Sequence, residues 1–126
     1  MPRLVDAALV GLGGAIGSIV RYLVGGAAIL LMDPAFPYGT LAVNLSGSFA
    51  AGVLVGIAGG RELATGTRLI LMTGFLGGFT TFSAFGVETA HLAEQQGMAA
   101  AAVNIVANVG IGLAAAALGL AAGRAY

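Results

Sequence analysis

The chain has 126 residues, of which 59% are hydrophobic and only 8% are charged, and its formal net charge is zero. Soluble domains carry about 25% charged residues, so this composition and a mean hydropathy of +1.01 predict a one-domain integral membrane protein. The neutral charge leaves no basic surface for nucleic acid, and the absence of cysteine excludes disulfides and thiolate-bound metals.

Four stretches of the chain are long enough to cross a hydrocarbon core about 30 Å thick, which takes roughly 20 apolar residues. They cover about residues 4–31, 38–59, 68–92 and 98–122. The first stretch is too long for a signal peptide and contains Arg21, so we expect it to remain as a transmembrane helix. The sequence therefore predicts a single all-α domain over residues 1–126, with four transmembrane helices and both termini on one side of the membrane.

The first span contains a pair of glycines and one deep charge. Gly13 and Gly17 are spaced by four, and small residues at this spacing let membrane helices approach closely. Arg21 lies well inside the span, and a charge at such a position is a candidate for function. We expect its guanidinium either to reach the membrane interface or to donate to carbonyls that a broken helix leaves exposed.

The second span carries a polar face. Thr40, Asn44 and Ser48 are spaced by four, so they lie on one side of the helix. The side chain of Asn44 has two N–H donors that need partners inside a membrane. It acts either as interhelical glue, worth roughly 1 kcal/mol, or as part of a polar track.

The second span also carries a face of small residues spaced by four: Ser48, Gly52, Gly56 and Gly60. Glycine is commoner in membrane helices in general, but four small residues spaced by four on one helix favour a packing face. Because helices this thin bury little against each other, we expect the protein to form an oligomer.

The third span holds the most unusual segment, residues 73–87, with four Gly, three Thr, one Ser, four Phe and no charge. Unpaired backbone N–H and C=O groups cost several kcal/mol each in lipid. So many glycines and hydroxyls predict a broken helix, which is tolerated where it is buried in protein or lines a watery path. A restart near Thr80 and Thr81 would aim free N–H groups and a positive dipole end into the membrane, which favours an anion.

Aromatic residues follow the same segment. Phe79, Phe82 and Phe85 recur every three residues. Such a stripe is more often core or lipid contact, but ring edges are the positive end of the aromatic quadrupole and favour an anion. Glu88, about two helical turns beyond the expected break, either ends a polar track or faces water.

The fourth span repeats the polar pattern of the second. Asn104, Asn108 and Gly112 share one face, and Gly119 and Gly123 form a further pair spaced by four. Two helices with amide stripes favour a hydrophilic track over simple interhelical glue.

Together these motifs closely resemble the Fluc (CrcB) family of small fluoride channels. The resemblance rests on GGAIGSIVRY at residues 13–22, YGTLAVNLSGSF at residues 38–49 and GFLGGFTTFSAF at residues 74–85. It covers nearly the whole chain, and the Ala- and Gly-rich fourth span contributes least. It implies a fluoride-selective channel in the cell (inner or plasma) membrane, which exports fluoride passively and lowers its toxicity. It also implies a dual-topology dimer: two antiparallel copies that enclose two pores.

The resemblance also implies roles for single residues. Phe82 and Phe85 match the phenylalanines whose ring edges face the ion, and Asn44 matches the asparagine of the pore. Polar positions beside or near the pore line are matched by Thr81, Ser83, Thr40 and Glu88. We extend the polar track to Asn104 and Asn108 of the fourth span and count Asn108 among the pore residues.

A cation is implied as well. Gly77 and Thr80 match positions whose backbone carbonyls, from both subunits, hold a buried structural Na⁺, and Arg21 is expected to have a structural role. The pore residues that the resemblance implies also suit fluoride conduction. A conducting site must bind fluoride through weak, multiple donors rather than through a full positive charge.

Three other classes of protein fit the sequence less well. A small dual-topology proton-coupled exporter is the alternative, but it needs a carboxylate deep in the membrane, and Glu88 is near a helix end. A purely structural subunit would leave residues 80–85 and both amide stripes unexplained. An enzyme would need a nucleophile–base pair or a metal-ligand cluster, which the sequence does not contain.

Overall fold

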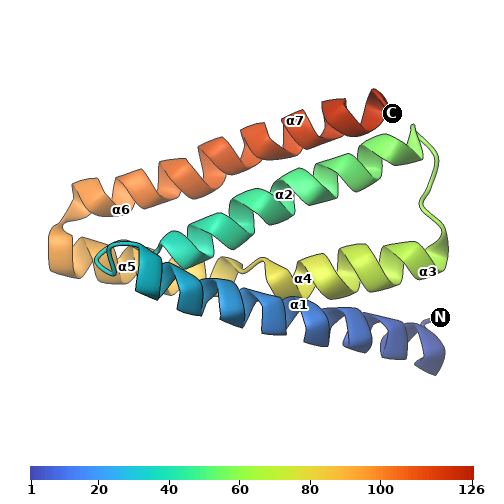
Figure 1. Ribbon diagram of the computed structural model, residues 1–126, viewed down its shortest axis with the longest axis horizontal. Helices are drawn as coiled ribbons and strands as arrows, with labels where there is room; N and C mark the ends of the chain where they lie inside the picture. Colours follow the sequence, from blue (N-terminus) through green and yellow to red (C-terminus); the bar gives the residue numbers. More distant parts are fainter.

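The computed structural model describes residues 1–126 and contains helices only. Four helical stretches are long and apolar enough to cross a membrane: Leu4–Leu31, Tyr38–Ala58, Thr65–Gln96 and Met98–Arg124. The prediction of an all-helical chain with four membrane-spanning segments is thereby confirmed. Both termini lie at the same end of the molecule (Figure 1), as an even number of spans requires.

The first two spans are single helices, and the last two are composite. The first is α1 (Leu4–Leu31) and the second α2 (Tyr38–Ala58). The third is built from α3 (Thr65–Thr67), the π-helical η1 (Arg68–Leu76), α4 (Gly77–Phe79) and α5 (Phe82–Gln96). The fourth is built from α6 (Met98–Ile105), the π-helical η2 (Val106–Ile111) and α7 (Gly112–Arg124).

The helix bounds differ from the predicted ones at four ends. α2 ends at Ala58, because Gly59 takes a left-handed conformation with a φ of 61° that favours glycine. The third span extends in both directions beyond the predicted residues 68–92, from Thr65 to Gln96, and the fourth continues to Arg124. The residues added to the third and fourth spans include the polar Thr65, Gln96 and Arg124, so hydropathy alone ends these two spans too early.

The helices pack in two pairs, α2 with α7 and α1 with the first half of the third span (Figure 1). In both pairs the close contacts lie at glycines. In the pair of α2 and α7, a Cβ added to Gly52 or Gly56 would collide with the backbone of α7. A Cβ added to Gly119 or Gly123 would likewise collide with the backbone of α2. The predicted face of small residues on the second span is therefore the seam with the fourth span, and it is used within one chain.

Gly60 continues the spacing of this face in the sequence but does not belong to it in the structure. A Cβ at Gly60 would meet nothing within 4 Å. The residue lies beyond the end of α2 with a φ of 82°, so it serves the turn rather than the seam.

The second pair is formed by α1 with the first half of the third span. A Cβ at Gly13 would collide with the carbonyl of Ile70, and one at Gly17 with the carbonyl of Phe75. The first half of the third span is thus held against α1. The second half, α5, packs on α6 instead.

Two extended residues separate these halves. Thr80 has φ −83° and ψ 158°, and Thr81 has φ −149° and ψ 120°. α4 ends before them at Phe79, and α5 begins after them at Phe82.

Candidate functional site

Thr81, the second of the two extended residues in the third span, is hydrogen-bonded by a side chain from α2. The backbone N–H of Thr81 donates to Asn44 Oδ1 at 2.8 Å, and Asn44 Nδ2 donates back to the Thr81 carbonyl at 3.1 Å. Both backbone groups of Thr81, which is buried, are therefore satisfied without a helix.

The start of α5 presents unpaired donors. Thr81 caps the helix, because its Oγ1 accepts the N–H of Ala84 at 3.2 Å. No backbone hydrogen bond crosses residue 81, so the N–H groups of Phe82 and Ser83 have no acceptor within the chain. The hydroxyls of Thr81 and Ser83 lie 3.3 Å apart beside them. Several neutral donors thus gather where a positive helix end is exposed.

The end of α4 presents unpaired acceptors. Arg21 Nε donates to the Gly78 carbonyl at 2.9 Å, which is the second of the two positions expected for this side chain. Thr80 folds back on Leu76, whose carbonyl accepts both its N–H and its hydroxyl. The carbonyl oxygens of Gly77 and Thr80 accept no hydrogen bond within the chain.

The amide stripes of the second and fourth spans meet. Asn44 Nδ2 donates to Asn108 Oδ1 at 2.9 Å, and Asn108 Nδ2 donates to Asn104 Oδ1 at 3.0 Å. Asn104 Nδ2 then donates to Thr89 Oγ1 at 2.9 Å on α5. Three asparagines and one threonine therefore form a continuous chain across α2, the fourth span and α5.

An open groove of about 420 Å³ runs past these groups. It is lined by eight of the residues named in the sequence analysis, namely Asn44, Ser48, Gly77, Thr80, Thr81, Phe82, Phe85 and Asn108. Residue Phe82 is 81% exposed and Phe85 only 8%. Their centroids lie 5.5 Å apart in an edge-on arrangement. No Lys or Arg lines the groove.

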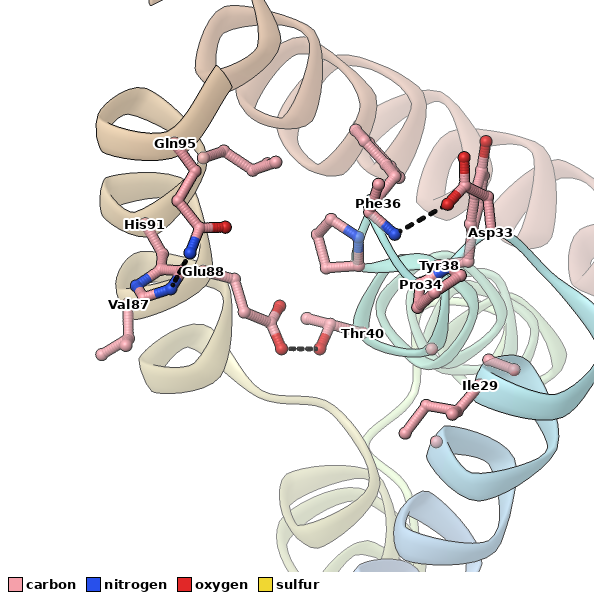
Figure 2. Close-up of a pocket in the computed structure, with 16 residues that line it drawn as sticks. Ile29, Asp33, Pro34, Phe36, Tyr38, Thr40, Val87, Glu88, His91 and Gln95 are labelled. Carbon is pink, nitrogen blue, oxygen red and sulfur yellow. Dashed lines mark hydrogen bonds between the residues drawn. The ribbon is translucent and has the colours of Figure 1, made fainter. Parts of the chain in front are cut away.

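A second cavity, of about 370 Å³, lies at the end of the molecule opposite the termini. Figure 2 shows Thr40 from α2 and Glu88 from α5 pointing toward each other in it, and the hydroxyl of Thr40 donates to Glu88 Oε1 at 2.9 Å. His91 and Gln95 bond to each other along the same helix at 2.8 Å. Because Thr40 precedes Asn44 by about one helical turn, this cavity and the groove follow the same face of α2.

Sequence reasoning found most of these residues but not their partners. Ser83 neighbours the groove through Thr81, whereas Thr40 and Glu88 belong to the end cavity. Thr89, which joins Asn104 to α5, was not predicted, since a Thr in a helix gives no signal by itself. Its hydroxyl also donates to the carbonyl of Phe85, one turn earlier in α5.

These features define a small four-span membrane protein with a neutral polar groove beside the extended residues Thr80 and Thr81 of its third span. Residues 8–120 match the family described as CrcB-like protein, Camphor Resistance (CrcB), and the chain belongs to this family.

Curated relatives match along nearly the whole chain. A protein named Fluoride-specific ion channel FluC from Rhizobium etli (strain CIAT 652) is 51% identical over 97% of this chain and 98% of its own. Proteins of the same name are 48% identical in Agrobacterium fabrum, over 96% of this chain and 98% of theirs, and 47% in Cereibacter sphaeroides, over 93% of both.

Proposed function

We propose that this multi-pass membrane protein is a fluoride-selective channel that lets fluoride leave the cell passively and so lowers its toxicity. The observation that carries the proposal is the groove, in which N–H groups, hydroxyls and phenyl rings meet without any cationic side chain. Fluoride is small and strongly hydrated, so a pore must replace its water with donors, yet bind it weakly enough for release. The names of the relatives support a channel, and we propose no enzymatic activity.

Within this function the ion is solvated by neutral groups near the start of α5. The ring edges of Phe82 and Phe85 offer positive quadrupole ends, and the free N–H groups of Phe82 and Ser83 offer donors. The interruption at Thr80 and Thr81 is then the break that exposes these groups to the ion.

The two N–H donors of Asn44 suggest direct binding of the ion, but both are used within the protein. Both of its N–H hydrogens are directed to protein acceptors, the Thr81 carbonyl and Asn108 Oδ1. We therefore propose that Asn44 shapes the site by holding Thr81 and that it reaches the ion by exchanging one of these bonds. Thr40 and Glu88 form the mouth of the pathway in the end cavity.

We propose that the functional unit is an antiparallel homodimer. The groove is open along one side, and Phe82 is exposed there although its ring is part of the proposed site. A second copy inserted in the opposite orientation would close the groove. The glycine seams are already used within the chain, so the dimer contact lies elsewhere, on the face that bears the groove.

A structural Na⁺ fits the same assembly. The carbonyls of Gly77 and Thr80 accept no hydrogen bond within the chain, and unwound backbone carbonyls of this kind coordinate Na⁺ in discontinuous membrane helices. The same carbonyls from a second copy would complete the ligand set. When bound, the cation would raise the electrostatic potential for an anion nearby.

The proposal is tested with purified protein in liposomes loaded with fluoride. We expect fluoride release after a potassium ionophore is added to balance the charge, and chloride-loaded liposomes to remain full under the same conditions. Equal release of chloride and fluoride would contradict selectivity. Release that requires a proton gradient would instead point to the proton-coupled exporter, with Glu88 as the carboxylate that exchanges protons.

A further inference from the structure

Asn104 is the most deeply buried polar side chain of the protein, with 0% of its surface exposed. It does not line the groove, and the function proposed above gives it no role. Its amide is nevertheless bonded on both sides: Nδ2 to Thr89 Oγ1 at 2.9 Å and Oδ1 to Asn108 Nδ2 at 3.0 Å.

The chain of amides from Asn44 to Thr89 has a fixed direction. At one end the Thr81 N–H can only donate and the Thr81 carbonyl can only accept, so Asn44 turns Oδ1 to the first and Nδ2 to the second, and its other Nδ2 hydrogen is directed to Asn108. At the other end the Phe85 carbonyl can only accept, so it takes the hydroxyl hydrogen of Thr89 at 2.6 Å. The Thr89 oxygen is thereby left as an acceptor for Asn104.

Each amide in the middle is therefore held in one of its two flip states. If Asn104 turned by half a rotation, its Nδ2 would face the Nδ2 of Asn108 and its Oδ1 would face a hydroxyl whose hydrogen is already committed. Two donors would then oppose each other in a buried site, which costs about 1–3 kcal/mol for each unsatisfied group.

We propose that Asn104 is a positioning residue for ion conduction, which holds Asn108 with its Oδ1 turned toward Asn44 and so supplies the acceptor for the second Nδ2 hydrogen of Asn44. This inference rests on the function proposed above and adds a residue outside the groove to it. Because the chain ends at Thr81, the N-cap of α5, and at Thr89 within α5, Asn104 ties the hydrogen bonding of Asn44 to the helix that carries the phenylalanine rings.

A purely adhesive role makes a different prediction. An Asn that only holds α6 against α5 would contribute roughly 1 kcal/mol to stability, and its loss would reduce the amount of folded protein. A positioning residue changes how well each folded channel conducts. Fluoride release from liposomes separates the adhesive role from the positioning role. The fraction of vesicles that empty measures the amount of active protein, and the rate of release measures the conduction of each channel.

The central variant is Asn104→Leu, which keeps the volume and removes both polar atoms. Asn108 then loses the side-chain acceptor but keeps the backbone carbonyl of residue 104, to which it also donates at 3.0 Å. We therefore expect a partial effect, a fluoride rate per channel lowered about tenfold, the change that corresponds to about 1.4 kcal/mol, or one hydrogen bond.

Thr89 supplies a matched pair that does not depend on the folding of Asn104→Leu. Thr89→Val keeps the shape and removes the hydroxyl, so we expect it to slow each channel, whereas Thr89→Ser keeps the hydroxyl and should conduct like wild type. In the double variant Asn104→Leu/Thr89→Val we expect no further loss beyond Asn104→Leu alone, because groups in one chain act non-additively.

A second measurement is independent of transport. Hydrogen–deuterium exchange of the Thr81 backbone amide reports its bond to Asn44, and we expect Asn104→Leu and Thr89→Val to speed it about tenfold. Unchanged rates per channel in both variants, equal impairment by Thr89→Ser and Thr89→Val, or additive losses would overturn the inference. If wild-type protein released no fluoride but exchange at Thr81 responded as expected, the proposed function would fail while the coupling of Asn104 to Asn44 stood.

Discussion

Asn44 pairs with Thr81 through both edges of its side-chain amide, accepting at 2.8 Å and donating at 3.1 Å. The side chain from α2 thus replaces both backbone partners that Thr81 loses between α4 and α5. In a membrane each unpaired group would cost several kcal/mol. The pair therefore explains how an extended residue is tolerated in the middle of an apolar span.

Replacing Asn44 by Asp should abolish most fluoride release. The carboxylate could still accept the Thr81 N–H but could not donate to the Thr81 carbonyl or to Asn108, and it would repel an anion in the groove. We expect a loss of roughly a hundredfold in rate, measured in liposomes with protein that runs as a single species in gel filtration.

Ser46→Ala is the control for this variant, since the hydroxyl of Ser46 bonds at 2.6 Å to the Ala42 carbonyl within its own helix. It should conduct like wild type. A folded Asn44→Asp protein with the wild-type rate would exclude Asn44 from the pathway.

The two phenylalanines should respond differently to replacement by Ile. Both variants lose a ring edge and should slow fluoride release. Phe85 is 8% exposed and Phe82 81% exposed, so only Phe85→Ile should also lower the stability of the protomer, by about 1 kcal/mol. Thermal unfolding and fluoride efflux on the same preparations separate the two effects, and a Phe82→Ile protein with undiminished efflux would count against the proposed role of this ring.

The seam between α2 and α7 should not tolerate a methyl group. In Gly119→Ala the new Cβ would collide with the Phe49 carbonyl, so the helices must separate, at a cost of roughly 1–3 kcal/mol. Gly26→Ala in α1 is the matched control, because a Cβ there meets nothing within 4 Å. We expect it to be neutral or slightly stabilising, by up to about 1 kcal/mol. Equal melting temperatures for the two variants would contradict the prediction that close packing of α2 against α7 stabilises the protein.

Orientation in the membrane is testable because the chain has no cysteine of its own. Arg3, Arg61, Arg68 and Arg124 lie on the side of the termini, which by the positive-inside rule favours a cytoplasmic position for that side. An antiparallel homodimer needs both orientations. We expect single cysteines at Ala35 and at Thr65, both exposed and at opposite ends, to be labelled in intact cells by a membrane-impermeant thiol reagent.

The outcome of that labelling decides the assembly. Labelling of both positions supports insertion in two orientations. If only Ala35 reacts, the chain has one fixed orientation and the homodimer is wrong; the partner would then be an oppositely oriented homologue.

The number of spans could be predicted from the sequence, because the thickness of the hydrocarbon core sets how many consecutive apolar residues a span needs. Helix ends were less well predicted. Gly59 ends α2 through its left-handed backbone, and Gly60 had continued the spacing of the small-residue face although it already lies in the turn. Spacing by four describes a helix but does not say where the helix stops.

The residues of the groove could be named from the sequence, but their hydrogen bonds could not. Asn44 and Asn108 lie on expected faces, yet only the packing of α2 against the fourth span decides that one amide donates to the other. The π-helical segments η1 and η2 gave no signal either, because a wider turn depends on contacts with neighbouring helices rather than on composition.

The division of the third span into two halves has a mechanical consequence. The first half is held by α1 and the second by α6, and only Thr80 and Thr81 connect them. We therefore expect the 32 residues from Thr65 to Gln96 to respond to bilayer stress as two short helical segments joined at this point rather than as one stiff helix. A bilayer of different thickness would be accommodated by bending at this joint, so lipid chain length would act on the same residues that carry the groove.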